Sequence, residues 1–309
     1  MCIRDRGTFE ATTDLRLHWQ DLRLRYDTPR PNSYRHFRAS AAQAELEKMW
    51  SPQIRFINRV GEATFTEPRL KLYPDGSVEL VIRTTAVYKT PVDFARFPFD
   101  HQPLRIDVAL REDTVESVDL DFSKEDVEFS RVARNVELPG WEPGLINLRR
   151  TLISGGNGYR YPLVSAELDV RRVAGGTLAT IFIPLFASLL IPFLATWMNR
   201  SDEGEFAVDA FELANVIIGG LFAVIALSFS VASSFPGLAG SDNTVNRLIG
   251  LNYLALAVGL VIAVVFYRYN LPRRWFGPYV QHQMFQFLTW AFPFLFVSIG
   301  LIFVLMAAA

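Results

Sequence analysis

Four long runs of uncharged, mostly apolar residues constrain the fold of this chain more than any other feature. They are Gly175–Met198, Leu213–Pro236, Leu248–Tyr267 and Met284–Ala309. A helix rises about 1.5 Å per residue, so about twenty residues cross the roughly 30 Å of hydrocarbon in a bilayer. Four such runs in succession are hard to explain as core helices of a soluble domain. We therefore predict four membrane-spanning helices, over 174–198, 213–236, 246–268 and 284–307.

Basic residues in the connecting loops predict the orientation of these spans. The loop between the third and fourth runs holds Arg268, Arg273 and Arg274, and the loop between the first and second holds Arg200. The loop between the second and third runs holds only Arg247. Because basic loops remain on the cytoplasmic side, the N-terminal part of the chain is expected outside.

Alternation with a period of two dominates the N-terminal part. In 104–110 and 164–171, apolar side chains alternate with polar or small ones, as is typical of half-buried strands. Pro74-Asp75-Gly76 and Gly155–Gly158 are turn sequences, and only Ala39–Met49 predicts a helix. We predict an all-β, immunoglobulin-like β-sandwich extracellular domain, followed by an all-α four-helix transmembrane bundle. The predicted domains are residues 1–173 and 174–309.

The second apolar run has an unusual face. Steps of four and three residues along a helix select a single stripe, which consists of Asn215, Gly219, Phe222, Ala226, Phe229 and Ser233. The stripe is polar at both ends, and Glu212 lies one turn before it. Small residues and serine are common where membrane helices pack, so the stripe alone is compatible with a packing face.

Composition excludes several classes of protein. The net charge is −1, which argues against a nucleic-acid partner. Cys2 is the only cysteine, so neither an intrachain disulfide nor a cysteine-based metal site is expected. We find no Ser/His/Asp spacing, metal-ligand cluster or phosphate-binding glycine loop, and we predict no enzyme, no cofactor and no metal. The opening MCIRDRGTFE carries charges where a signal peptide has an apolar core, so we expect an incomplete N-terminus.

Short motifs in a fixed order carry a family resemblance. They are Trp19-Gln20-Asp21, Trp50-Ser51-Pro52, Phe97-Pro98-Phe99-Asp100 with Gln102, Arg172 twelve residues before Pro184, and Pro236 at the end of the second run. With these motifs and four apolar runs, the chain resembles a bacterial, cysteine-less pentameric ligand-gated ion channel of the Cys-loop receptor superfamily. The resemblance extends from about Thr8 to the C-terminus, and it implies that the family's first strand, expected before Thr8, is missing.

The resemblance implies a pore along the second span. Five copies would surround the pore, with the stripe from Asn215 to Ser233 as its lining and Glu212 as a cation-selecting carboxylate ring. Phe222 and Phe229 would form apolar rings that block ions by dewetting. The loop before the second span is longer than the family pattern, so Asp209 is a rival for the selectivity ring.

The resemblance also implies the residues that couple the sandwich to the pore. They are Phe97, Pro98, Phe99, Asp100, Arg172 and Pro236, with an ion pair between Asp100 and Arg172. The positions at which animal members form their disulfide are Thr90 and Leu104 here.

The ligand-binding residues that we predict are Arg111, Tyr159 and Tyr161. An arginine suits a carboxylate better than an amine. Alternatively the stimulus is pH, sensed by interface carboxylates or by His18, His36 and His101.

The expected partners are further copies in a homopentamer, membrane lipids, permeating inorganic cations, and a small-molecule agonist or protons. The expected location is the bacterial inner membrane, with the N-terminal domain periplasmic or extracellular. The alternative function is a membrane-anchored extracytoplasmic binding or sensor protein that does not conduct.

Overall fold

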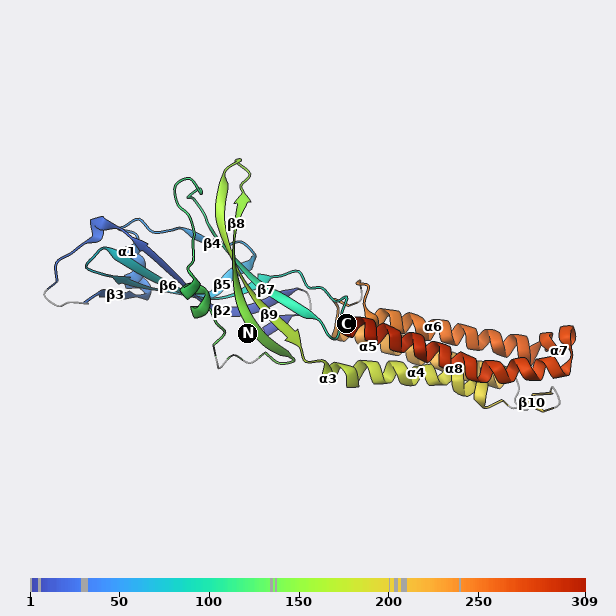
Figure 1. Cartoon of the computed structure of the whole chain (residues 1–309). Coiled ribbons are helices and arrows are strands. Elements are labelled where there is room, and N and C mark those ends of the chain that lie inside the picture. The colour runs from blue at the N-terminus through green and yellow to red at the C-terminus, as the bar shows by residue number, and fades with distance from the viewer. Residues whose placement is uncertain are drawn as a thin grey trace. The chain divides into compact units, whose positions relative to one another are not determined.

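The chain divides into two compact units, which a computed structural model of the protein describes separately (Figure 1). The described residues are 2–4, 7–28, 33–133, 136, 138–199, 201–202, 205–206, 210–238 and 240–309. The first unit comprises Met1–Val92 and Gln102–Val170, and the second comprises Asp93–His101 and Arg171–Ala309. The loop Asp93–His101 therefore packs with the C-terminal helices, although it lies within the N-terminal part of the sequence.

Two sheets make up the first unit. The five-stranded sheet has the order β1-β2-β6-β5-β3, with bounds β1 Cys2–Arg4, β2 Thr8–Gln20, β3 Arg35–Arg38, β5 Arg59–Leu72 and β6 Ser77–Lys89. The four-stranded sheet has the order β4-β7-β9-β8, with bounds β4 Ile54–Phe56, β7 His101–Leu110, β8 Trp141–Ser154 and β9 Arg160–Arg172. The predicted β-sandwich is confirmed.

Apolar residues of both sheets form the core of the sandwich. Phe9 and Tyr88 of the first sheet join Leu104, Leu168 and Val170 of the second in one buried cluster. These residues belong to the alternating segments of the strands, so their apolar side chains share the inner face. The alternation thus explains why the two sheets pack face to face.

Turns and short helices complete the first unit. Gly76 lies between β5 and β6 with φ +85°, and a Cβ there would lie 2.5 Å from the carbonyl oxygen of Asp21, so only glycine fits. Helix α1 (Ala39–Leu46) lies within the predicted helical segment, whereas α2 (Lys124–Phe129) was not predicted. A capping box between Ser123 and Asp126 starts α2. That Ser-x-x-Asp spacing was the available signal.

The second unit contains four helices long and apolar enough to cross a membrane. They cover Ala174–Trp197, Ala210–Ser234, Thr244–Arg268 and Pro278–Ala308. The first span consists of α3 (Ala174–Thr177), the π-helical η2 (Leu178–Phe182) and α4 (Ile183–Trp197). The second span is α5 (Ala210–Ser234), and the fourth is α8 (Pro278–Ala308). The third span consists of α6 (Thr244–Ile262) and the π-helical η3 (Ala263–Arg268). A short helix, α7 (Leu271–Phe276), connects the third and fourth. The predicted all-α bundle is confirmed.

Small and polar residues hold the first three spans together. A Cβ on Gly220 of α5 would lie 2.8 Å from Ile191 and 2.9 Å from Leu256, so the three helices meet closely at this glycine. Buried Asn252 of α6 accepts a hydrogen bond of 2.6 Å from the hydroxyl of Ser188 in α4. Its amide donates to the carbonyls of Leu248 and Leu185.

A short hairpin lies in the connection between the first and second spans. Its strands are β10 (Ser201–Asp202) and β11 (Glu205–Phe206). The ring of Phe206 lies 4.7 Å from that of Tyr267 and 5.1 Å from that of Phe285. Phe206 of this connection thus contacts the third and fourth spans.

Candidate functional site

One face of α5 is not covered by any of the residues that the structure describes. Its buried residues lie on the opposite side of the helix and are Leu213, Ile217, Gly220, Val224 and Val231. All six residues of the predicted stripe are exposed, including Phe222 at 67% and Phe229 at 72%. Glu212 is exposed in the first turn of the same helix. Its rival Asp209 lies outside the described residues.

Two adjacent glycines show the difference between the faces of α5. Gly219 belongs to the stripe, and a Cβ there would meet nothing within 4 Å. Gly220, the next residue, lies against Ile191 and Leu256. The chain therefore packs one side of the helix tightly and leaves the stripe open.

A buried ion pair links the Asp93–His101 loop to the start of the first span. Arg172 donates from Nε to Oδ1 of Asp100 at 2.7 Å and from Nη2 to Oδ2 at 3.1 Å. The two side chains are only 9% and 2% exposed. The backbone N–H of Arg172 also donates to the carbonyl of Asp100. This bidentate geometry satisfies both charges away from water.

Phe97 connects this ion pair to the end of α5. The guanidinium carbon of Arg172 lies 4.8 Å from the centre of the Phe97 ring, within the range of a cation–π interaction. Phe97 is fully buried and makes an edge contact with Phe235, at 5.6 Å between ring centres. Phe235 directly follows α5 and precedes Pro236. A continuous set of contacts thus runs from Asp100 through Arg172 and Phe97 to the end of α5.

Three of the predicted coupling residues take part in these contacts, and the others lie next to them in the sequence. Asp100, Arg172 and Phe97 come together in it, while Phe235 was missed by sequence reasoning. Pro98 and Phe99 belong to the same loop, where the N–H of Phe99 donates to the carbonyl of Arg96. An aromatic residue directly before the proline that follows a span was the signal for Phe235.

A hydrogen bond joins the two ends of the loop that contains Asp93–His101. The hydroxyl of Thr90 donates to the carbonyl of Pro103 at 2.7 Å. Thr90 and Leu104, the positions that the resemblance matches to the disulfide of animal members, are each 2% exposed. Both side chains are therefore buried.

The predicted ligand residues lie on two segments of the first unit that meet. Tyr159 and Tyr161 flank the β8–β9 hairpin tip, where the amide of Asn157 donates to the Tyr161 hydroxyl. Arg111 follows β7 and is exposed, with Glu112 at 4.0 Å. The N–H of Val115 donates to the carbonyl of Arg160, which joins the loop after Arg111 to the hairpin.

Two carboxylates of the first unit, Asp14 and Glu79, are ion-paired and have lowered pKa values. The hydrogen bond from Arg83 holds the pKa of Asp14 below its ordinary value. Burial acts to raise the pKa of Glu79, but hydrogen bonds from Lys71, Tyr73 and Arg16 together outweigh it and lower the pKa.

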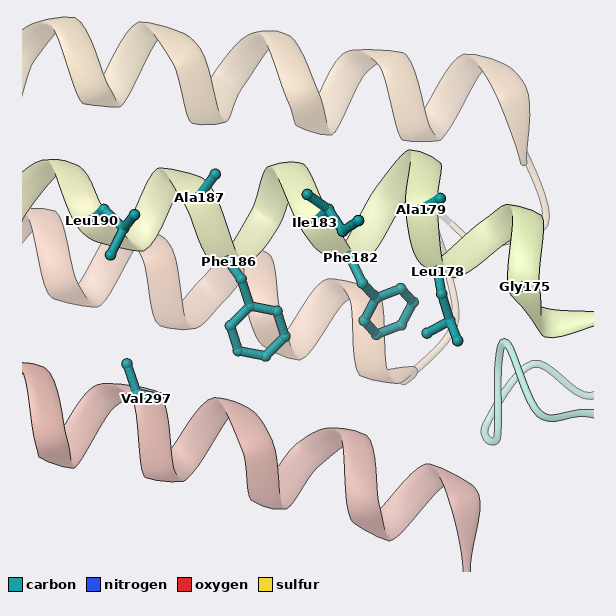
Figure 2. Close-up of a pocket in the computed structure, with 9 residues that line it drawn as sticks. All are labelled: Gly175, Leu178, Ala179, Phe182, Ile183, Phe186, Ala187, Leu190 and Val297. Carbon is teal, nitrogen blue, oxygen red and sulfur yellow. The ribbon is translucent and has the colours of Figure 1, made fainter.

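An apolar groove of about 690 Å³ runs along the first span (Figure 2). Figure 2 shows the rings of Phe182 and Phe186 on the side toward Val297 of α8. The remaining lining residues also belong to the first span: Gly175, Leu178, Ala179, Ile183, Ala187 and Leu190. The lining suits hydrocarbon and contributes no polar group to a site.

The comparison with protein families decides the assignment. The profile of the neurotransmitter-gated ion-channel ligand binding domain matches residues 4–172. The chain belongs to the pentameric ligand-gated ion channel family. In the described residues, the sandwich and the four apolar helices agree with this membership, and the chain is a multi-pass membrane protein of a channel family, not an enzyme.

Two relatives illustrate the breadth of the channel family. The chain is 26% identical to a proton-gated ion channel of Gloeobacter violaceus over 235 residues, which are 74% of this chain and 59% of the relative. It is 26% identical to a gamma-aminobutyric acid receptor subunit theta of Mus musculus over 198 residues, or 62% of this chain and 29% of the subunit. Each match thus spans less than two thirds of the relative's length.

Proposed function

We propose that this chain is the subunit of a homopentameric, cation-selective channel whose pore is lined by α5. The observation that carries the proposal is the open face of α5 from Asn215 to Ser233. That face lies opposite a tightly packed one and has polar residues at both ends. A helix that served only as an anchor would need neither feature.

The residues of the open face have separate roles in the proposed pore. Five Glu212 carboxylates at the cytoplasmic mouth attract cations and repel anions. Asn215 forms a polar constriction next to them. Phe222 and Phe229 form two apolar rings that stop ions when the pore narrows enough to lose its water. Gly219, between Asn215 and Phe222, and Ala226, between the two apolar rings, leave the pore wider at their levels.

Gating in this proposal passes through the contacts around Arg172. A stimulus in the sandwich changes the position of the Asp93–His101 loop. Because Phe97 contacts Phe235, that displacement reaches the end of α5 directly. The buried Asp100–Arg172 pair keeps Phe97 in register with the first span.

The proposed stimulus is protons or a small carboxylate. One relative is named as a proton-gated channel. The pair of Arg111 and the tyrosine-bearing hairpin suits a carboxylate, because guanidinium binds carboxylates by two hydrogen bonds. The proposed location is the bacterial inner membrane, with the sandwich outside, in accord with the basic residues of the loops.

Electrophysiology in liposomes tests this function. Wild-type currents are recorded while pH and small carboxylates are varied. Neutralising the ring by Glu212→Gln should shift the reversal potential in a salt gradient toward that of an unselective pore. Phe222→Ala should raise the current without stimulus. Absence of current under every condition would favour the alternative, a membrane-anchored sensor that does not conduct.

Cysteine accessibility tests the pore lining without needing a known stimulus. Cys2 is the only native cysteine, so Cys2→Ser supplies a clean background. Cysteines at Phe222 and Phe229 should react with a water-soluble thiol reagent, whereas one at buried Val224 should not. A cysteine at Leu221, which is 39% exposed but about 100° around the helix from Phe222, is the matched control for exposed positions that face away from the stripe. Equal reactivity at Leu221 and Phe222 would contradict the proposed lining.

A further inference from the structure

A group of aromatic side chains joins the connection before α5 to the third and fourth spans. We call it the Phe206 cluster; it consists of Phe206, Phe266, Tyr267 and Phe285. Phe206 belongs to β11, four residues before α5 begins at Ala210. Phe266 and Phe285 are buried, whereas Phe206 and Tyr267 are partly buried. The proposed conduction and gating use none of these four side chains.

Three rings of the cluster contact one another edge to face. The ring of Phe206 lies 4.7 Å from that of Tyr267 at an angle of 70°, and 5.1 Å from that of Phe285 at 72°. Tyr267 and Phe285 also contact each other, with 5.9 Å between ring centres and an angle of 73°. Such contacts stabilise aromatic pairs beyond the burial of their surface. The three rings therefore hold together three segments, β11, η3 and α8, that are distant in the sequence.

The cluster is connected to the start of α5 in two ways. Along the chain, the four steps from Phe206 to Ala210 span at most about 14 Å, so a docked ring limits where α5 can begin. Through space, η3, which carries Tyr267, packs against α5. Glu212 lies in the first turn of α5. The position of the Phe206 ring therefore restricts the position of the Glu212 carboxylate.

One polar atom of the cluster opposes the docking of Phe206. The hydroxyl of Tyr267 is buried, and among the described residues it has no hydrogen-bond partner. A buried hydroxyl without a partner destabilises the state that buries it, because it has given up its hydrogen bonds to water. Tyr267 also belongs to a π-helical segment, a rare arrangement that is frequent at functional sites. The aromatic contacts thus favour the docked ring, and the buried hydroxyl disfavours it.

We propose that Phe206 is a positioning residue for Glu212 and acts through reversible docking of its ring against Tyr267 and Phe285. While the ring is docked, the first turns of α5 are held in place and the Glu212 carboxylates of five subunits keep one level. When the ring leaves, the hydroxyl of Tyr267 reaches water and the start of α5 gains freedom to move. The docking concerns a single subunit, whereas its effect on a ring of carboxylates rests on the proposed function.

Hydrogen–deuterium exchange of the purified full chain in detergent, followed by mass spectrometry, tests the docking. The amides of residues 214–217 are measured, because their hydrogen-bond partners are carbonyls in the first turns of α5 itself. Phe206→Ala should make these amides exchange severalfold faster, since the start of α5 loses its attachment. Tyr267→Phe should slow their exchange, because it removes the hydroxyl that opposes docking. Phe206→Tyr keeps an aromatic ring and should exchange like the wild type.

Phe292→Ala is the matched control for loss of an aromatic contact on the fourth span. Phe292 lies about two turns beyond Phe285 in α8 and is buried. Its ring contacts that of Phe193 in the first span at 5.1 Å, the distance that also separates Phe206 from Phe285. Phe292→Ala should lower the melting temperature but leave the exchange of 214–217 unchanged. Equal acceleration in this variant and in Phe206→Ala, or no acceleration in Phe206→Ala, would overturn the proposal.

Reversal potentials in a salt gradient test the effect on Glu212. Phe206→Ala should shift the reversal potential toward that of an unselective pore, while Phe206→Tyr and Phe292→Ala should keep the wild-type value. An unchanged reversal potential in a conducting Phe206→Ala channel would overturn the positioning role. The exchange measurement needs no current. A chain that shows the expected exchange pattern but never conducts would therefore contradict the proposed function and still support the docking of Phe206.

Discussion

The second and third spans have the same length and nearly the same hydropathy, yet the chain packs them differently. Both helices have 25 residues, with mean hydropathies of 2.3 and 2.5. In their most apolar windows, 44% of the third span is buried within the chain but only 22% of the second. Hydropathy alone thus identifies a span without indicating whether its own chain covers it.

The positions of their polar residues explain the difference. Asn252 of the third span is 1% exposed and hydrogen-bonds to Ser188. Asn215 and Ser233 of the second span lie on the open face. A polar side chain in a membrane needs either a partner or water. Asn252 meets that need inside the subunit, and the hydroxyl of Ser233 donates to the carbonyl of Ser230 in its own helix. Asn215 is expected to meet it through water in the assembled pentamer.

The largest effect is expected where α5 depends on contacts beyond the bundle. Asp100→Ala leaves the buried Arg172 without its carboxylate, which costs about 3–5 kcal/mol. Because Arg172 contacts Phe97, and Phe97 contacts Phe235, gating or assembly should be lost. Currents and thermal melts of the purified protein measure both.

A surface ion pair is the control for this variant. Asp242→Ala breaks the exposed pair with Arg247 and should leave the melting temperature close to that of wild type, because water and salt screen a surface pair. Normal currents in Asp100→Ala would show that the Asp100–Arg172 ion pair has no part in coupling. The second span would then not depend on contacts outside the helix bundle, as the comparison with the third span assumes.

The two faces of α5 are compared directly by substituting adjacent glycines. Gly220→Leu forces a side chain between Ile191 and Leu256 and should destabilise the protein by about 1–3 kcal/mol. Gly219→Leu places the same side chain in open space and should leave the melting temperature close to that of wild type. Equal destabilisation would mean that the open face is packed, against the proposed pore.

The two asparagines provide a smaller test of the same contrast. Asn252→Ala removes the buried amide's hydrogen bonds to Ser188, Leu185 and Leu248, although the Ser188 hydroxyl keeps the carbonyl of Leu185, and should cost about 1–2 kcal/mol. Asn215→Ala should leave the free energy of unfolding nearly unchanged and alter conductance instead. Thermal melts and single-channel recordings read the two outcomes. The contrast fails if Asn215→Ala is the more destabilising change.

The smallest expected effect is the coupling energy between Ser188 and Asn252. A double-mutant cycle with Ser188→Ala and Asn252→Ala should give about 0.6 kcal/mol, the usual size for hydrogen bonds between membrane helices. Chemical denaturation in mild detergent measures the free energy of unfolding of the wild type, the two single variants and the double variant. A coupling energy near zero would mean that the hydrogen bond to Ser188 does not stabilise the protein. The hydrogen bonds from Asn252 to the backbone carbonyls of Leu185 and Leu248 would then account for its contribution.

Much of the fold follows from the periodicity of the sequence. Alternation in 104–110 and 164–171 predicts the strands that became β7 and β9, and the four uncharged runs predict the four spans. Periodicity succeeds here because each element buries one face or crosses a hydrocarbon layer. Helix α2 escaped prediction because it has no buried residue, so no apolar pattern marks it.

Helical spacing in the sequence determined which residues form the stripe on the second span. The resemblance to the channel family predicted the ion pair between Asp100 and Arg172. Only the tertiary structure decided that Gly220 is packed while Gly219 is open, that Asp93–His101 belongs with the helices, and that Phe206 packs between Tyr267 and Phe285. The physical reason is that periodicity states which residues share a face. What covers that face depends on segments that are distant in the sequence.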